Sequence, residues 1–305
     1  MEDETSHTCS LPLKRRTILN HPKTMNTETL TTTVDPAAQY ITEIGGRNYM
    51  IDEGSQRIQF LDSRFYQVKP GEYVPSVTTI LEAYPKGAAF NEWLKKHGQD
   101  SDDIRDEAGR RGSVVHHMTE LYDAGVEVQL MTDDGTPQYK LSEWSMFERY
   151  VDFRTRFPAT IHATELNMVS GQLGYAGTLD RVMTIGDTTY LMDIKTSGGV
   201  YDSYWYQQAA YDNLLTYTGH IARLFPDGEI PQLKLAILWL NANTRVHKEG
   251  VMQGPGWQFI PQKETTKDLL DMFDCIHAVW NKANAGMKPR LTSYSLSHSL
   301  KSTKQ

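Results

Sequence analysis

With 305 residues, 39% of them hydrophobic and 23% charged, the chain can bury the core of one large domain or two modest ones, and no apolar run approaches the ~18 residues of a membrane span. Its 31 Lys and Arg residues against 38 Asp and Glu residues give a net charge of −7. This balance argues against a protein that coats nucleic acid by electrostatics alone, but it allows a local phosphate site. The two cysteines are too few for a disulfide framework, a four-cysteine zinc site or an iron–sulfur cluster, so we expect a reducing, cytoplasmic location.

The N-terminal part is predicted to be a disordered leader followed by short strands. Residues 1–35 carry Thr, Ser and charge without an apolar period, and their acidic start resembles neither a secretory signal nor an Arg-rich transit peptide. Alternating apolar and polar residues between glycine turns then predict three strands, at residues 40–44, 48–52 and 57–61. After a turn at Gly71, Ser76 or Thr78 is expected to cap a short helix.

Helical and strand-like patterns alternate over the rest of the chain. Apolar spacing predicts helices at residues 88–97, 104–124, 142–157, 204–217 and 265–283. Residues 163–195 are strand-like, with a Gly186-Asp187 turn between two runs, and residues 233–241 are predicted to form a short buried strand. Residues 293–305 are rich in Ser and Lys and are predicted to be a flexible tail.

This order of elements predicts a single mixed α/β domain over residues 36–292. Within it, residues 36–105 supply N-terminal strands and helices, and residues 106–292 form the core. Neither an internal repeat nor a central linker interrupts the pattern.

Two acidic residues and a lysine in the predicted strands form the first candidate site. Asp193 and Lys195 are two apart, so their side chains project from one face of a strand while Ile194 points into the core. A hairpin about Gly186 could bring Asp180 beside Asp193. Two carboxylates can then hold Mg²⁺ or Mn²⁺ while the lysine positions a nucleophilic water. The triplet alone is a weak signal, because chance predicts about two such triplets in a chain of this composition. The ordinary explanation is a pair of exposed charges on a strand. The apolar residues just before the triplet indicate a buried strand, where a charged end is unusual, and they favour a functional role.

A predicted helix upstream adds a histidine to the candidates. Because His116 and Glu120 are four residues apart, they share a helix face. The spacing differs from that of a zinc-protease helix, and a lone helix histidine is more often a surface residue than a ligand. Arg111, on the same helix, is a candidate contact for phosphate groups, although exposed helix arginines are common without one.

Taken in order, these residues resemble the motifs of the PD-(D/E)XK nuclease superfamily, in its RecB-like exonuclease branch. The family pattern places Gly-x-x-x-His, Gly-x-x-Asp, Asp/Glu-x-Lys and Gln-x-x-x-Tyr in sequence, which here fall at Gly112–His116, Gly177–Asp180, Asp193–Lys195 and Gln207–Tyr211. From His116 to Tyr211 the match covers about a third of the chain. Residues 75–81 also resemble a segment of the mitochondrial genome-maintenance exonuclease and its phage-encoded relatives.

The resemblance implies a restriction-endonuclease-like core, with a central mixed sheet flanked by helices and a strand-rich N-terminal extension. It implies that the metal ligands are His116, Asp180, Asp193 and the Ile194 carbonyl. It implies that the catalytic residues are Asp180, Asp193 and Lys195. Gln207 and Tyr211 would support the site and contact the substrate backbone. Glu165 and Glu120 match acidic positions of the family more loosely, and a solvated strand end is an equal explanation for Glu165.

The function implied by the resemblance is that of a Mg²⁺- or Mn²⁺-dependent DNA exonuclease, which prefers single strands or DNA ends in replication, recombination or repair. Its partner would be DNA and not a membrane, and its location the cytoplasm, or the host cytoplasm if phage-encoded. Two other classes stay open, namely an inactive nucleic-acid-binding module and a metal-dependent hydrolase of small phosphate compounds. The intact set of Asp180, Asp193 and Lys195 argues against the binding module, because binding alone needs no metal ligands.

Aromatic residues cluster just after the Asp-x-Lys triplet. The cluster consists of Tyr201, Tyr204, Trp205 and Tyr206. These rings could stack on the bases of a single strand, and core packing is the alternative for at least half of them. The sequence contains no Gly-x-Ser-x-Gly motif and no Walker loop, so a serine hydrolase and a P-loop ATPase lack support.

Overall fold

The computed structural model describes most of the chain between its two ends. The described residues are 41–44, 47–52, 57–60, 63–69, 71–226, 228–242 and 250–289. The predicted leader, residues 1–35, and the predicted tail, residues 293–305, lie outside them. Among the helices in the described part, none is both long and apolar enough to cross a membrane.

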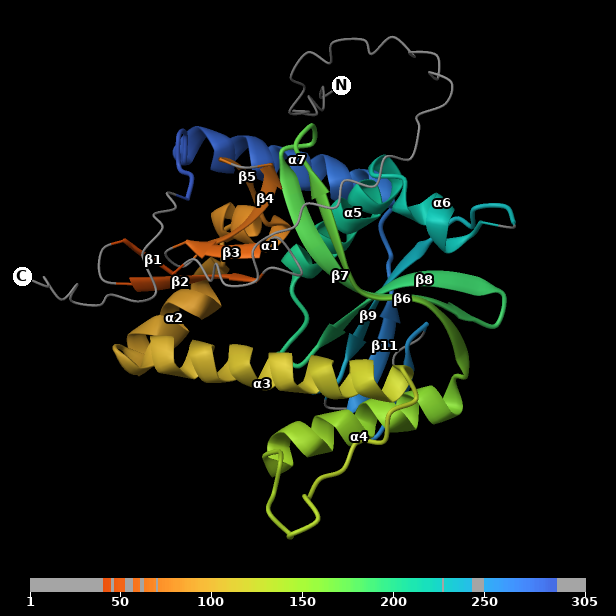
Figure 1. Cartoon of the computed structure of the whole chain (residues 1–305). Coiled ribbons are helices and arrows are strands. Elements are labelled where there is room, and N and C mark those ends of the chain that lie inside the picture. Colours follow the sequence, from red (N-terminus) through yellow and green to blue (C-terminus); the bar gives the residue numbers. More distant parts are fainter. Residues whose placement is uncertain are drawn as a thin grey trace, which may run out of the picture.

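A six-stranded mixed sheet forms the centre of the molecule (Figure 1). Its order is β10-β11-β9-β8-β7-β6, and each neighbouring pair is antiparallel except β8 with β9. The strands are β6 (Ala159–Ser170), β7 (Tyr175–Ile185), β8 (Thr188–Lys195), β9 (Lys234–Trp239), β10 (Met252–Gly254) and β11 (Trp257–Pro261). A parallel pair needs a crossover, which the chain makes through α5 (Asp202–Tyr217) and α6 (His220–Leu224).

Helices cover both faces of this sheet, as Figure 1 shows. α3 (Asp100–Asp123) and α4 (Leu141–Arg156) pack on one face, in a core that includes Met192 of β8. α5 and α7 (Thr266–Ala283) pack on the other, in a core that includes Leu191. Adjacent residues of β8 enter different cores because side chains of a strand alternate between the faces of its sheet. The molecule is therefore an α/β structure whose mixed sheet is flanked by helices.

A second sheet, of five antiparallel strands in chain order, forms the N-terminal side. Its strands are β1 (Ile41–Ile44), β2 (Arg47–Asp52), β3 (Arg57–Phe60), β4 (Ser63–Lys69) and β5 (Glu72–Pro75). Ser76 then caps α1 (Val77–Ile80), because its hydroxyl accepts a hydrogen bond from the Thr79 amide. A 3-10 turn, η1 (Leu81–Ala83), and α2 (Gly87–His97) lead into α3.

The predicted helices and the Gly186-Asp187 turn are confirmed, but the strands differ in several places. Residues 163–195 form parts of three strands and not two, and β6 begins earlier, at Ala159. A register shift at Ile161–Ala163 breaks the alternation of β6, which hides that strand in the sequence. β4, β5, α6 and the β10–β11 hairpin were not predicted. The expected division between residues 105 and 106 falls inside α3.

Candidate metal centre

The β7–β8 hairpin brings the predicted carboxylates together. It turns at Gly186, whose φ of 57° is in the left-handed region that glycine adopts readily, and pairs Arg181 with Met192. One position further along this register, Asp180 comes beside the end of β8. Its Oδ2 accepts a hydrogen bond of 2.7 Å from the Ile194 amide. The predicted pairing of Asp180 with the Asp-x-Lys strand is therefore present in the fold.

Helix α3 delivers His116 to the same place. The helix passes close to the end of β8 at Gly112, where a Cβ atom would lie 3.3 Å from the Thr196 hydroxyl. His116 Nε2 lies 2.9 Å from the Ile194 carbonyl oxygen. Its Nδ1 faces two carboxylates, at 3.5 Å from Glu165 and 3.6 Å from Asp180. The two nitrogens of the His116 ring therefore face different groups, Nε2 the carbonyl predicted as a ligand and Nδ1 the two carboxylates.

Glu165 enters the centre through an unusual backbone conformation. It sits within β6, across from Asp180 in the register, and its φ of 45° is in the left-handed region that residues other than glycine seldom adopt. Its Oε1 is buried without a hydrogen-bond partner in the described part of the chain. His116, Glu165 and Asp180 each offer a ligand atom, all within 4.8 Å of one another. Oxygen and imidazole donors, with one buried oxygen unsatisfied, fit a divalent cation.

Asp193 and Lys195 form a pair beside these three residues. Lys195 Nζ lies 2.6 Å from Asp193 Oδ2, and it also donates to Gln207 Oε1 at 3.3 Å. Gln207 Nε2 donates in turn to Asp193 Oδ1 at 3.3 Å and to the Tyr211 hydroxyl at 3.2 Å. Asp193, expected as a metal ligand, is therefore engaged by the lysine. Gln207 and Tyr211, expected to support the site, do contact it from α5.

The glycine of the Gly-x-x-Asp motif has a packing role. A Cβ atom at Gly177 would lie 2.3 Å from the Tyr211 ring. A bare backbone at this point of β7 therefore lets the ring of Tyr211 lie against the sheet, with its hydroxyl in reach of Gln207.

The charges of the centre depend on one another. Burial alone lowers the pKa of His116, but the nearby carboxylates, chiefly those of Asp180 and Glu165, outweigh it and raise the pKa to about 9. Burial raises the pKa of Asp193 to about 6 in spite of the lysine. Burial opposes a charged Lys195, yet Asp193 and Asp180 outweigh it and raise the lysine pKa. Lys195 is therefore a cation at neutral pH.

A buried arginine that the sequence reasoning missed lies behind the carboxylates. Arg181, 0% exposed, donates from Nε to Asp123 at 2.7 Å and from Nη1 to the Asp180 carbonyl at 2.7 Å. Its Nη2 donates to Thr119 at 3.0 Å, and Nη1 lies 3.6 Å from Glu165 Oε1. The signal that could have revealed it is a charged residue, directly after Asp180, inside a strand expected to be buried.

Two predicted residues are not brought into the cluster. Glu120 is half-exposed, and its carboxylate lies 3.6 Å from His117 and does not enter the cluster around His116. Arg111 lines a cavity of about 470 Å³ together with acidic residues, including Asp103 and Glu107. The structure gives Arg111 no contact with the cluster among the described residues, so its predicted role in phosphate binding has no support from its position.

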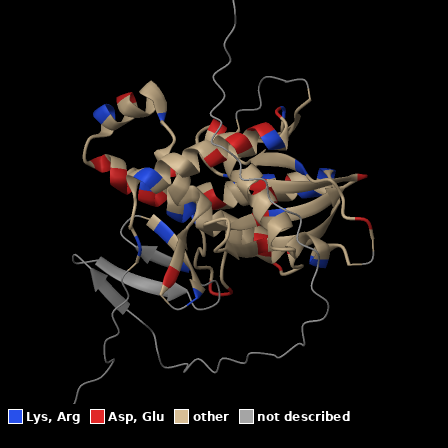
Figure 2. Ribbon diagram, turned by 90° about the horizontal axis from the view of Figure 1, so that it is seen from above, with Lys and Arg blue, Asp and Glu red and all other residues tan. Residues whose placement is uncertain are grey.

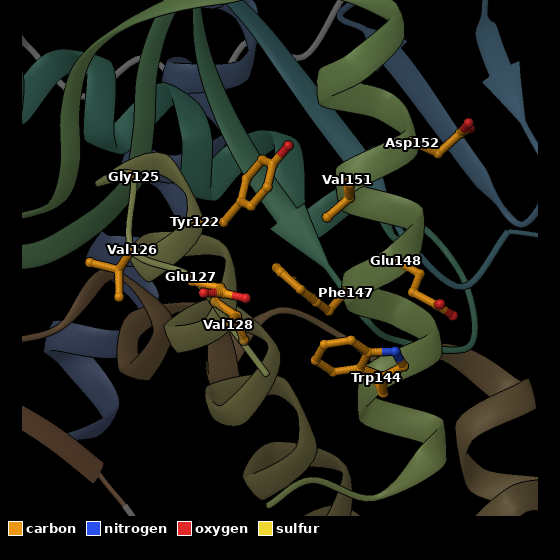
Figure 3. A pocket seen from close by; sticks show the side chains of 10 residues that line it. All are labelled: Tyr122, Gly125, Val126, Glu127, Val128, Trp144, Phe147, Glu148, Val151 and Asp152. Carbon is orange, nitrogen blue, oxygen red and sulfur yellow. The ribbon is translucent and has the colours of Figure 1, made fainter. Parts of the chain in front are cut away.

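A separate cavity of about 660 Å³ lies between the end of α3 and α4 (Figure 3). It is lined largely by apolar side chains, among them Tyr122, Trp144 and Phe147. None of the predicted site residues lines it. The residues that form the candidate metal centre therefore lie at the end of β8 and not in this cavity, whose acidic lining residues are Glu127, Glu148 and Asp152.

No protein-family model matches the sequence, and a search of curated proteins gives no match either.

Proposed function

We propose that the chain is a metal-dependent nuclease with a restriction-endonuclease-like core, from the RecB-like branch of the PD-(D/E)XK superfamily. The proposed reaction is the hydrolysis of DNA phosphodiester bonds by an exonuclease that acts on single strands or ends during replication, recombination or repair in the cytoplasm. One observation carries the proposal: His116, Glu165 and Asp180 converge from three elements beside the Asp193–Lys195 pair. The order of the motifs in the sequence supports it.

The side chains suggest a division of roles. A bound Mg²⁺ or Mn²⁺ would lower the pKa of an attacking water and neutralise charge on the phosphate. His116, Glu165 and Asp180 are placed to hold the ion, since their ligand atoms are close together. Lys195 keeps its proton at neutral pH, so it serves as a positive charge that stabilises the developing anion and not as a general base. Asp193 orients this ammonium through their 2.6 Å contact.

The test is cleavage of an end-labelled single-stranded oligonucleotide in Mg²⁺, Mn²⁺, Ca²⁺ and EDTA. We expect shortened products in Mg²⁺ and Mn²⁺ and none in EDTA; Ca²⁺ should fail, because it accepts looser coordination and activates water poorly. Asp180→Asn should abolish cleavage, whereas Asp187→Asn, in the exposed turn of the same hairpin, should not.

Each alternative class has its own outcome in this assay. Binding of the oligonucleotide without cleavage under any metal would identify a nucleic-acid-binding module. Release of phosphate from small esters, with the oligonucleotide left intact, would identify a phosphohydrolase. Full cleavage in EDTA would overturn the metal-dependent mechanism.

A further inference from the structure

The surface beside Lys195 ends in an exposed aromatic ring. Tyr201 is 55% exposed, and its ring meets that of Tyr204 edge to face, with centroids 5.4 Å apart. The Tyr204 ring lies 4.3 Å from the Lys195 ammonium, a distance at which cation and ring attract each other. A line of contacts thus leads from the candidate metal centre, through Lys195 and Tyr204, to an aromatic side chain in solvent.

The segment that carries this ring is anchored to the sheet. The Ser197 carbonyl accepts hydrogen bonds from Trp239 Nε1 at 2.8 Å and from Asn241 Nδ2 at 3.4 Å. Ser197 also donates to the Gly199 carbonyl at 2.8 Å. Tyr201 itself is the N-cap residue of α5. An aromatic ring held in this way binds a partner with little further loss of conformational entropy.

Gly199 leaves the ring uncovered. A Cβ atom at this position would lie 3.8 Å from the Tyr201 hydroxyl and Cζ, which is ordinary van der Waals contact. Gly199 is not among the glycines with positive φ, so its backbone does not require glycine. A larger side chain could therefore stand here, and it would cover part of the ring that now faces solvent.

We infer that Tyr201 is a platform on which an unpaired nucleobase of the substrate stacks, next to the phosphate handled by Lys195. The inference rests on the proposed function and names its substrate class, a strand whose bases are free to leave the stack. Aromatic rings bind single strands in this manner with little dependence on sequence, since each base has a π-face. Basic and acidic residues are interspersed along the chain and its net charge is −7, so attraction to phosphates alone gives little affinity (Figure 2).

The test measures binding without catalysis, as fluorescence anisotropy of a labelled single-stranded oligonucleotide in EDTA. Tyr201→Ala should weaken binding roughly 5- to 150-fold, the loss of one stacked base, and Tyr201→Phe should retain it. Gly199→Leu should weaken binding although the tyrosine is present, because leucine covers the ring. The matched control is Tyr217→Ala, since Tyr217 is also exposed but lies at the other end of α5.

A second series replaces one base at a time by an abasic nucleotide. One position should weaken binding to the wild-type protein and have no effect on Tyr201→Ala, which identifies the base that stacks. Equal binding by wild type and a folded Tyr201→Ala would overturn the inference. It would also be overturned if Tyr201→Ala bound more weakly than wild type by the same factor at every abasic position, because no single base would then depend on the ring. Because these measurements need no cleavage, a failure of the proposed nuclease activity is seen separately, in the metal assay.

Discussion

At the scale of single residues, the candidate centre assigns different tasks to neighbouring charges. Lys195→Ala should lower the cleavage rate on the order of 10²–10³, by analogy with the removal of an oxyanion donor, while oligonucleotide binding persists. The exposed Lys234 of the neighbouring strand provides the control, Lys234→Ala, which should cleave normally. Rates and binding isotherms, with circular dichroism to show folding, check the prediction. Cleavage at the wild-type rate by Lys195→Ala would remove this strand from the catalytic machinery.

The second prediction at this scale concerns the contribution of Arg181 to stability. It is fully buried and donates to Asp123, to the Asp180 carbonyl and to Thr119, so removing it takes a donor from three acceptors in the interior, although Arg154 still pairs with Asp123. Arg181→Met should lower the free energy of unfolding by ~3–5 kcal/mol, because each buried acceptor that loses its donor costs about 1–3 kcal/mol. Arg156→Met breaks an exposed helix pair with Asp152 and should cost only about 0–1 kcal/mol. Urea denaturation of both variants measures the difference, and equal losses would contradict the assignment of Arg181 as a buried structural charge.

At the scale of elements, β7 and α5 are in close contact at Gly177, a residue without a side chain. Gly177→Ala should destabilise the protein by ~1–3 kcal/mol, because its methyl group overlaps the Tyr211 ring. Gly198→Ala is the matched control, since a Cβ atom there meets no other atom within 4 Å and its backbone is not left-handed. Thermal unfolding of the two variants compares the sites. If both melt alike, the close approach of strand and helix does not constrain the fold.

The local parts of the fold were readable from the sequence, and the non-local parts were not. The Gly186 turn, the helix cap expected at Ser76 or Thr78 and found at Ser76, and the apolar spacing of α3 each depend on a few neighbouring residues, and each was predicted. β6 was placed too late because its register shift disrupts alternation. β10 and β11 are short strands that depend on non-local pairing, since β11 pairs with β9 and β10 pairs with β11. Such pairings are decided by tertiary contacts that periodicity does not record.

The same distinction holds for the candidate site. Asp193 and Lys195 share a face because side chains two residues apart in a strand project to the same side, and this does not depend on the rest of the fold. The part played by Glu165 depends on a left-handed residue inside a strand, for which glutamate gives no signal. Glu120 was wrongly grouped with His116, since a shared helix face does not say which neighbour a flexible side chain chooses.

At the scale of the whole molecule, the centre ties stability to pH. The carboxylates hold the pKa of His116 at about 9 in the folded protein, against 6.5 for the free side chain. The folded state therefore binds this proton more tightly than the unfolded state. The resulting stabilisation, up to roughly 3 kcal/mol, is fully present below pH 6.5 and is lost as the pH rises through about 9.

Urea denaturation in EDTA from pH 6 to pH 10 checks this prediction. The wild-type free energy of unfolding should fall across the window, and His116→Gln should show a smaller fall. His117→Gln is the control, because that side chain is 62% exposed and lies outside the cluster. A wild-type profile that is flat, or that rises with pH, would show that the carboxylates do not hold the proton on His116.

The β7–β8 hairpin also bears on how the centre assembles during folding. Its strands are joined by a turn of two residues, Gly186 and Asp187, whereas His116 and Ile194 meet across 78 positions of sequence. Because long loops close more slowly than short ones, Asp180 and Asp193 should meet early and His116 should dock late. Substitutions in the hairpin should then slow folding, and those at the α3 contact should mainly speed unfolding. A partial opening that lifts α3 would thus separate the histidine from its carboxylates while the hairpin stays intact.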